Sequence, residues 1–569
     1  MLQCYPYGVG QGDEGVCLLL HIGGYRVLLD CGLQDITPLI DQPQPPADFV
    51  FCSHAHADHA RSLLQLHQAF PQLPVYVSEL TAPLLPLNWL GEAVPWFWQS
   101  LPWRTQIEVE PGLTVQLFPA GHLPGAAAIA LTGQTEAGRT ERVLYTGDYQ
   151  LTNAKLVDGL KIEDLRGLSP QVLILEAGYG TARFPQRRRQ ENQLIERLDR
   201  AIASGQSVLL PLSKLGLAQE ILILLRTHSL FSGRDVTLWV HGDIGAACDV
   251  YEELLPCFPV NIQNFAQYQS LFWDIRVRPY LRRLSSVDRL RSILEQPTLS
   301  VKAVPEKACI VLTDAIAQLQ EFCQIGGDWL LLLPQHQDLR LDWLTEAQRE
   351  KPEEKADRQW MRSTAVQRVT VETYTLAEHG DQASTTQLIH NLQPQHLVFV
   401  HGAAAEIAEL AALNELSDRY KVHAPITGHW LELPIGEAFI QPERPAVTYE
   451  GEVAELAGMV SISLPDTIIT DPRWSRLGET GLIEARWQGE ELVLRGISQR
   501  EWLGQQQLQG ARCGNCRYYH LSADRARAAK FGAAKLSDAK VGICRNTRSP
   551  LYQFQVANDS YCPVFESRD

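Results

Sequence analysis

The run His54-Ala55-His56-Ala57-Asp58-His59 constrains the fold of this chain more than any other feature, because it gathers four side chains that bind metals. A strand is expected over 48–52 just before the run, and a helix over 60–69 just after it. If the run begins extended, His54 and His56 point the same way. Imidazole and carboxylate groups suit zinc and similar ions, and packing them together without a common ligand is costly. The run therefore predicts a metal site at the end of a strand.

Three more candidate ligands stand at the ends of expected strands. His122, Asp148 and His401 follow strands expected near 114–118, 143–145 and 396–400. Each of these residues alone is more typical of a structural role than of a metal ligand. Together they repeat one arrangement, in which a strand delivers a single His or Asp to the same edge of a sheet.

In this order, the motifs resemble those of the metallo-β-lactamase superfamily, and Asp30 in Leu28-Leu29-Asp30-Cys31-Gly32 matches its first motif. The resemblance spans most of residues 1–435. It implies an αββα sandwich that binds two zinc or other divalent ions, which together activate water and polarise the scissile bond. The resemblance implies that the first ion is held by His54, His56 and His122. It implies that the second ion is held by Asp58, His59 and His401, and that Asp148 bridges the two ions. Asp30 is expected to orient the ligand loop.

The long interval between Asp148 and His401 alternates strands and helices, which predicts a parallel sheet covered by helices. Its beginning around Glu176 and the later run Glu378-His379-Gly380-Asp381-Gln382 resemble the β-CASP subfamily, which includes the mRNA 3′-end-processing endonuclease and RNase J. The resemblance implies that His379 protonates the leaving group and that Glu176 orients it, so that the expected catalytic set is Asp58, Glu176 and His379. A histidine at His401 is typical of the RNA-acting members.

Candidate substrate contacts come from the inserted region. Arg187, Arg188, Arg189 and Lys214 could each meet backbone phosphates. A solvated helix start explains the three arginines equally well. Several substrate-facing turns depart from the family pattern. Ala177 and Gly178 replace Ser and Thr, and Ala377-Glu378 replaces Ser-Ala. The Arg expected after Pro211 is missing, with Lys214 and Leu217 nearby instead.

These departures keep two other functions open beside the ribonuclease. One is a metallohydrolase that acts on a small ester, thioester or phosphate, which the long insert and His379 oppose. The other is a non-catalytic RNA-binding or scaffold protein, which the complete ligand set opposes. An alanine at His379 discriminates among them, because it removes turnover only from a nuclease.

The tail carries a second cluster. Cys513, Cys516, Cys544 and Cys562 form the pattern C-x₂-C-x₂₇-C-x₁₇-C, which is typical of a four-thiolate site for zinc or, as the second choice, a [4Fe–4S] cluster. Residues 511–569 hold ten Lys/Arg and five Asp/Glu, whereas the whole chain has a formal charge of −16. A basic tail on an acidic body suggests a polyanion partner such as single-stranded RNA, and a solvated surface is the alternative.

The predicted fold class is α/β, with five parts. They are the first part of the metallo-β-lactamase domain (1–183), the β-CASP insert (184–366), the second part of the metallo-β-lactamase domain (367–440), a small β-rich module (441–509) and the Cys-cluster module (510–569). The sequence has neither a membrane-spanning apolar run nor a signal peptide, and eight of its twelve Cys are scattered. We therefore expect a cytoplasmic protein. Its oligomeric state stays open between monomer and homodimer.

Overall fold

A computed structural model describes residues 2–295, 308–335 and 369–435, together with short segments between 452 and 557. The chain divides into two compact units, Met1–Pro445 and Ala446–Asp569. In the part that the structure describes, no helix is both long and apolar enough to cross a membrane.

The first unit begins with a seven-stranded sheet in the order β20-β1-β2-β3-β4-β5-β6. Its second and third strands form a hairpin, which turns at Gly23-Gly24, where both residues have positive φ. Parallel pairing then adds β4, β5 and β6 in turn. The strand bounds are β1 Gln3–Val9, β2 Val16–Ile22, β3 Tyr25–Leu29, β4 Phe49–Phe51, β5 Val75–Ser78, β6 Trp98–Leu101 and β20 Leu431–Glu432.

A second seven-stranded sheet has the order β19-β18-β11-β10-β9-β8-β7. It joins residues before and after the insert, because β11 pairs in parallel with both β10 and β18. The strand bounds are β7 Ile107–Glu110, β8 Leu113–Pro119, β9 Ala127–Gln134, β10 Thr140–Tyr145, β11 Val172–Glu176, β18 His396–Val400 and β19 Lys421–His423.

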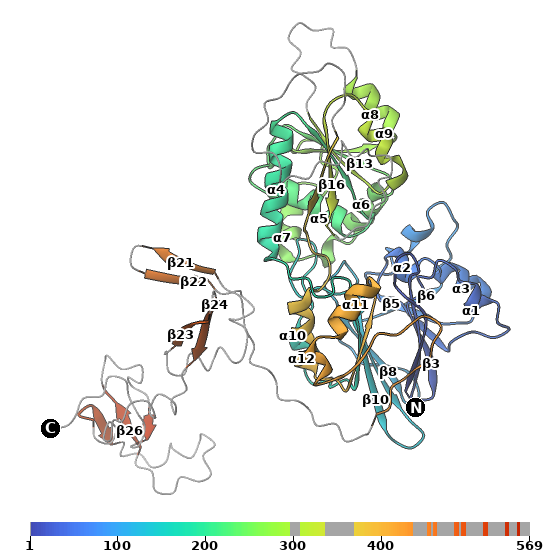
Figure 1. The fold of residues 1–569 in the computed structure, drawn as a ribbon, viewed down its shortest axis with the longest axis vertical. Helices are drawn as coiled ribbons and strands as arrows, with labels where there is room; N and C mark the ends of the chain where they lie inside the picture. Colours follow the sequence, from blue (N-terminus) through green and yellow to red (C-terminus); the bar gives the residue numbers. More distant parts are fainter. Residues whose placement is uncertain are drawn as a thin grey trace. The chain divides into compact units, whose positions relative to one another are not determined.

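Alternating side chains pack the two sheets face to face. Leu18 and Leu20 lie in the core between the sheets with Val172 and Ile174, whereas Leu19 and Leu173 face outward into a second core with the helices. Figure 1 shows helices beside the first sheet and further helices beside the second. They are α1 Thr37–Ile40, α2 Ala57–Ala60 and α3 Leu63–Ala69, then α10 Gln382–Leu392, α11 Ala404–Ala411 and α12 Asn414–Ser417. This arrangement confirms the predicted αββα sandwich.

The insert has its own six-stranded sheet, in the order β14-β13-β15-β12-β16-β17, and every neighbouring pair is parallel, as predicted. The strand bounds are β12 Ser207–Pro211, β13 Thr237–His241, β14 Tyr280–Leu284, β15 Ile310–Thr313, β16 Trp329–Pro334 and β17 Val369–Tyr374. The helices are α4 Arg187–Ala203, α5 Leu217–Thr227, α6 Ile244–Glu253, α7 Val260–Ala266, α8 Val287–Leu294 and α9 Leu319–Cys323.

One predicted boundary needs correction. The sequence pattern assigns residues from 367 onward to the second part of the sandwich, but β17 pairs with β16 along its whole length. The sheet of the insert therefore continues past residue 366 to Tyr374. Pairing with a strand of the insert satisfies the backbone groups of β17, which the local sequence pattern could not assign to either sheet.

The second unit is described only in its strands. Two hairpins are formed by β21 Glu452–Leu456 with β22 Met459–Ser463 and by β23 Ile483–Gln488 with β24 Glu491–Gly496. A three-stranded sheet of β25 Tyr519–Leu521, β26 Val541–Cys544 and β27 Gln555–Ala557 follows. The predicted cysteines Cys513 and Cys562 lie outside the described residues.

Candidate metal centre

Strand ends bring the predicted ligands to one edge of the sandwich. His54 and His56 follow β4, and Asp30 follows β3. On the second sheet, β18, β11 and β10 are adjacent and parallel, so their carboxyl ends present His401, Glu176 and Asp148 side by side. These residues are adjacent because parallel strands end at the same edge, which explains how positions hundreds of residues apart meet.

The first group consists of three imidazoles and one carboxylate. His56 Nδ1 lies 3.2 Å from His54 Nε2 and 3.0 Å from His122 Nε2. Asp148 Oδ2 lies 3.5 Å from His54 Nε2 and 3.7 Å from His122 Nε2. One ligand atom from each residue therefore faces a common point, as the donor groups for a single metal ion would.

The second group shares the same carboxylate. Asp58 Oδ2 lies 3.0 Å from His401 Nε2 and 3.8 Å from His59 Nε2. Asp148 Oδ1 lies 3.3 Å from His59 Nε2, so the two oxygens of Asp148 face different groups. This is the geometry expected of a residue that bridges two ions.

The protonation of the first group suits a cation. His122 Nδ1 faces the Glu378 carbonyl at 2.9 Å, and His56 Nε2 faces the Leu215 carbonyl at 3.3 Å. Carbonyl oxygens only accept hydrogen bonds, so these two nitrogens carry the protons and the opposite nitrogens carry lone pairs. Burial, the largest cause, lowers the pKa of His56 and lowers that of His122 well below its ordinary value. Neutral rings with converging lone pairs repel one another unless a cation lies between them.

Buried polar atoms without hydrogen-bond partners also indicate a metal site. His59 Nε2, Asp148 Oδ1 and His401 Nδ1 are buried and make no hydrogen bond with any described residue. Buried polar atoms without partners are costly and uncommon in folded proteins. The residues present therefore fit two divalent ions, one for each group.

Asp30 supports the second ligand group through hydrogen bonds. Its carboxylate accepts hydrogen bonds from His59 Nδ1 at 2.8 Å, from Tyr145 Oη at 2.5 Å and from both the backbone N–H and the hydroxyl of Ser53 at 2.6 and 2.8 Å. Asp30 itself has a φ of 61°, a conformation that non-glycine residues rarely adopt. These contacts fix the ring of His59 so that Nε2 faces Asp148.

Replacing Asp30 by asparagine is expected to weaken metal binding by about 10- to 100-fold, because the amide cannot accept all four hydrogen bonds. The measurement is the metal retained per chain during titration with a competing chelator. Asp41→Asn, at an exposed position, is the matched control and should retain metal like the wild type. Equal retention by Asp30→Asn and Asp41→Asn would show that Asp30 does not support the metal centre.

Two backbone carbonyls link the metal centre to other parts of the first unit. The carbonyl of Leu215 comes from the loop between β12 and α5 of the insert, and that of Glu378 from the segment before α10. Gly216, next to Leu215, has a φ of 89°, and a Cβ there would lie 3.3 Å from Glu378 Oε1 and 3.7 Å from His56 Nε2. The insert thus takes part in orienting a candidate metal ligand.

His379 lies beside the two ligand groups. Its Nδ1 is 3.2 Å from Glu176 Oε1 and 3.8 Å from Asp148 Oδ2, and its ring centroid is 4.7 Å from that of His122. Burial opposes the charged imidazole, but the Glu176 and Asp148 carboxylates outweigh it and raise the pKa of His379 to about 10. Glu176 is fixed in turn by the Gly178 N–H at 2.9 Å. The geometry places an imidazole held by Glu176 next to the candidate metal centre.

The predicted phosphate contacts differ from one another. Arg188 and Arg189 are exposed at the start of α4, whereas Arg187 is mostly buried and lies near Glu191 and Glu220, at 3.5 and 3.8 Å. Lys214 donates to the Leu87 carbonyl at 2.5 Å and so joins the insert to the sandwich. Arg187 and Lys214 are therefore already engaged within the protein, and a role in substrate binding remains a prediction for all four.

Glu378 is a residue of the site that sequence analysis marks only as a departure from a motif. Burial raises the pKa of its carboxyl group to about 7, although the nearby charges of His379 and Arg187 lower that pKa. Its carbonyl holds His122, and its side chain accepts a hydrogen bond from the Leu217 N–H at the start of α5. Glu378 therefore contacts both the metal centre and the insert, a role that no spacing in the sequence could indicate.

Comparison with known protein families matches residues 25–201 to the beta-lactamase superfamily domain. Over nearly its whole length, the chain is similar to "Uncharacterized protein sll0514" of Synechocystis sp., with 46% identity over 99% of this chain and 96% of that protein.

More distant relatives have names that state an activity or an assembly. "Probable RNase MJ4" of Methanocaldococcus jannaschii is 28% identical over 38% of this chain, and "Integrator complex subunit 11" of Danio rerio is 28% identical over 39% of it. The matches span only 54% and 41% of those two proteins.

Proposed function

The chain belongs to the metallo-β-lactamase superfamily, in its β-CASP group, and on that premise we propose that it is a metal-dependent ribonuclease that cleaves single-stranded RNA. One observation carries the proposal. His379, held by Glu176 at 3.2 Å, stands beside two groups of ligand atoms that both approach Asp148. A phosphodiester has an alkoxide leaving group whose departure a positioned acid assists, and His379 is placed to supply that proton.

The residues divide the chemistry among them. Bound divalent ions would activate water and stabilise charge on the phosphate, and the two ligand groups fit such ions. Asp30 orients His59, and Leu215 and Glu378 orient His56 and His122. Because Glu176 occupies Nδ1 of His379, Nε2 is the nitrogen that remains to face the substrate. As water adds to phosphorus and the P–O bond breaks, His379 gives its proton to the leaving oxygen.

The relatives support the substrate class. Two of them are named as an RNase and as an RNase J-like protein, both from Methanocaldococcus jannaschii. Their matched regions cover about half of each of those proteins, 54% and 61%. RNA as the substrate of this chain therefore rests on the His379–Glu176 pair together with those names.

A cleavage assay tests the proposal directly. End-labelled single-stranded RNA is incubated with the metal-loaded full chain, and the products are separated by length. We expect shorter products from the wild type and none after chelation, with cleavage restored by added divalent metal. The proposal fails if the wild type, with two ions bound per chain, leaves RNA intact while it hydrolyses a small ester, thioester or phosphate.

For the tail, we propose that Cys513, Cys516, Cys544 and Cys562 hold one zinc ion or one [4Fe–4S] cluster. Support comes from the two cysteines that the structure describes. Cys516 and Cys544 are both buried, and they flank one small sheet, where Tyr519 pairs with Cys544 and its N–H donates to the Cys516 carbonyl at 3.1 Å.

Substituting Cys544 by serine is expected to remove one zinc equivalent, or the iron and sulfide of one cluster, from the purified chain while the His/Asp ions remain. Elemental analysis and visible absorbance distinguish the two cofactors. The control is Cys257→Ser, at an exposed cysteine of the insert. Unchanged metal and sulfide content in Cys544→Ser would contradict the proposed thiolate site.

A further inference from the structure

An arginine-rich surface covers the edge strand of the insert. Residues 273–291, which include β14 and most of α8, hold six Arg but only two Asp, in a chain with a net charge of −16. Asp274 pairs with Arg276, Asp288 with Arg291, and Asp249 with Arg283. The remaining arginines of the segment, Arg278, Arg282 and Arg289, are exposed and make no ion pair with any residue that the structure describes. We call this segment the β14 surface.

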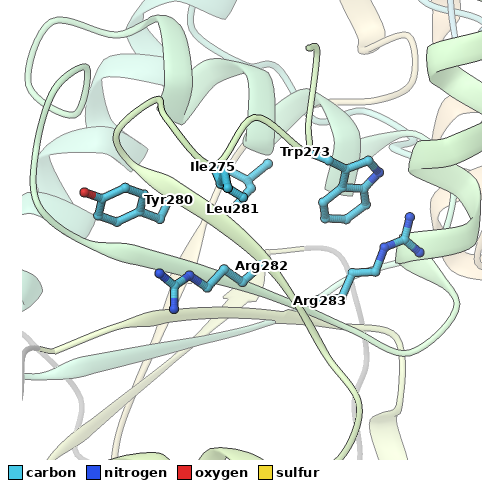
Figure 2. A pocket seen from close by; sticks show the side chains of 6 residues that line it. All are labelled: Trp273, Ile275, Tyr280, Leu281, Arg282 and Arg283. Atoms are coloured by element: carbon cyan, nitrogen blue, oxygen red, sulfur yellow. The ribbon is translucent and has the colours of Figure 1, made fainter. Parts of the chain in front are cut away.

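Aromatic rings accompany these arginines. The Arg283 guanidinium lies 4.2 Å from the ring centroid of Trp273, and that of Arg282 lies 5.6 Å from the ring of Tyr280. Figure 2 shows Trp273 and Tyr280 on either side of Ile275 and Leu281, with Arg282 and Arg283 alongside, so that the six side chains line a shallow pocket. Ile275 is 76% exposed, which is high for an aliphatic side chain.

Protection of an edge strand explains only part of the arginine-rich composition of the β14 surface. Charged residues on an edge strand prevent pairing with other chains, and β14 is the edge of its sheet. Charge of either sign serves that purpose, yet all the unpaired charges named here are arginines. Edge protection also gives no reason for exposed apolar and aromatic groups between them. Guanidinium groups that alternate with aromatic faces are instead typical of surfaces that bind single-stranded nucleic acid.

The sheet places the carboxyl end of this surface within reach of the metal centre. All neighbouring strands of the insert are parallel, so β14 ends at the same edge as β12, and the loop after β12 touches His56 through Leu215. Two strands, β13 and β15, separate β14 from β12. Three strand spacings of about 4.8 Å give roughly 14 Å between the two ends along that edge.

We propose that the β14 surface is a second binding site for single-stranded RNA, which holds nucleotides beyond the cleavage position through phosphate contacts to Arg278 and Arg282 and base stacking on Tyr280 and Trp273. The identification of the strand as RNA rests on the proposed function. The site increases affinity for long substrates and takes no part in the chemistry.

Binding experiments on the full chain test this site. Fluorescence anisotropy measures the affinity for a labelled 20-nucleotide RNA in a His379→Ala background, where the strand stays intact. For a single strand, the slope of log K against log salt is negative, and each lost phosphate contact makes it about 0.7 less negative. Arg278→Ala/Arg282→Ala should therefore make the slope about 1.4 less negative and weaken binding roughly 10- to 25-fold near 0.1 M salt. Tyr280→Ala should weaken it about fivefold or more.

The matched control removes two exposed arginines from the sandwich, Arg139→Ala/Arg142→Ala, and should change neither affinity nor slope. With His379 present, the Arg278/Arg282 variant should raise KM for the 20-mer and leave cleavage of a tetranucleotide unchanged. Wild-type affinity and slope in the Arg278/Arg282 variant would overturn the site, and an acidic protein would then be the partner to seek. If the wild type binds RNA through these arginines but never cleaves it, the proposed function fails and the site stands.

Discussion

Replacing His54 and His56 together by alanine should abolish cleavage, with kcat/KM falling by more than about 10⁶-fold, toward the uncatalysed rate. The reason is geometric. His54 Nε2 and His56 Nδ1 supply two of the three imidazole nitrogens of the first ligand group, and His122 with one oxygen of Asp148 is too small a set to retain an ion. Elemental analysis should show the loss of at least one ion per chain.

The control for that variant removes two histidines that lie outside the ligand groups. His228→Ala/His429→Ala should keep both ions and full activity, because neither residue belongs to a group of convergent ligand atoms among the described residues. Residual cleavage by the His54/His56 variant at more than about one per cent of the wild-type rate would show that the first group is not the catalytic metal site.

His379→Ala should lower kcat by about 10²- to 10⁴-fold, the range typical of a lost general acid, and leave KM and the metal content nearly unchanged. The side chain contacts Glu176 and lies next to the ligands, yet the two ligand groups remain complete without it. Single-turnover cleavage of labelled RNA gives the rate of the chemical step. A substrate with a better leaving group than a ribose hydroxyl should recover most of the lost rate, because it needs no proton.

Glu176→Gln gives the matched comparison for His379. The amide keeps the size of the side chain but removes the charge that favours the protonated ring. We expect a smaller decrease in kcat than for His379→Ala, with both ions still bound. Full activity of His379→Ala on every RNA tested, at unchanged metal content, would contradict the assigned role of the histidine.

The sequence brings the candidate metal ligands to one edge because these residues follow strands. A residue at the carboxyl end of a parallel strand has a nearly fixed place, so the strand pattern alone assigns Asp148, Glu176 and His401 to one edge. The αββα sandwich and the parallel sheet of the insert follow from the same regular pattern of apolar residues.

Other parts of the site could not be predicted, since they depend on backbone atoms and on tertiary packing. The carbonyl of Leu215 carries no sequence signal, because every residue has one. In the sequence Glu378 is only a departure from a motif, and its contacts with His122 and Leu217 alone reveal its role. The strand β17 could join either sheet by composition, and only its pairing with β16 decides the matter.

The hydrogen bond from His56 to Leu215 has a thermodynamic consequence. A carbonyl of the insert orients a ligand of the sandwich, so a state in which the two domains separate has a lower metal affinity than the closed state. Because binding and closure are thermodynamically linked, bound metal favours the closed state by the same free energy by which closure strengthens metal binding. Metal supply would therefore shift the balance between closed and open molecules, and a metal-starved cell would hold an enzyme that is both inactive and more exposed to proteolysis.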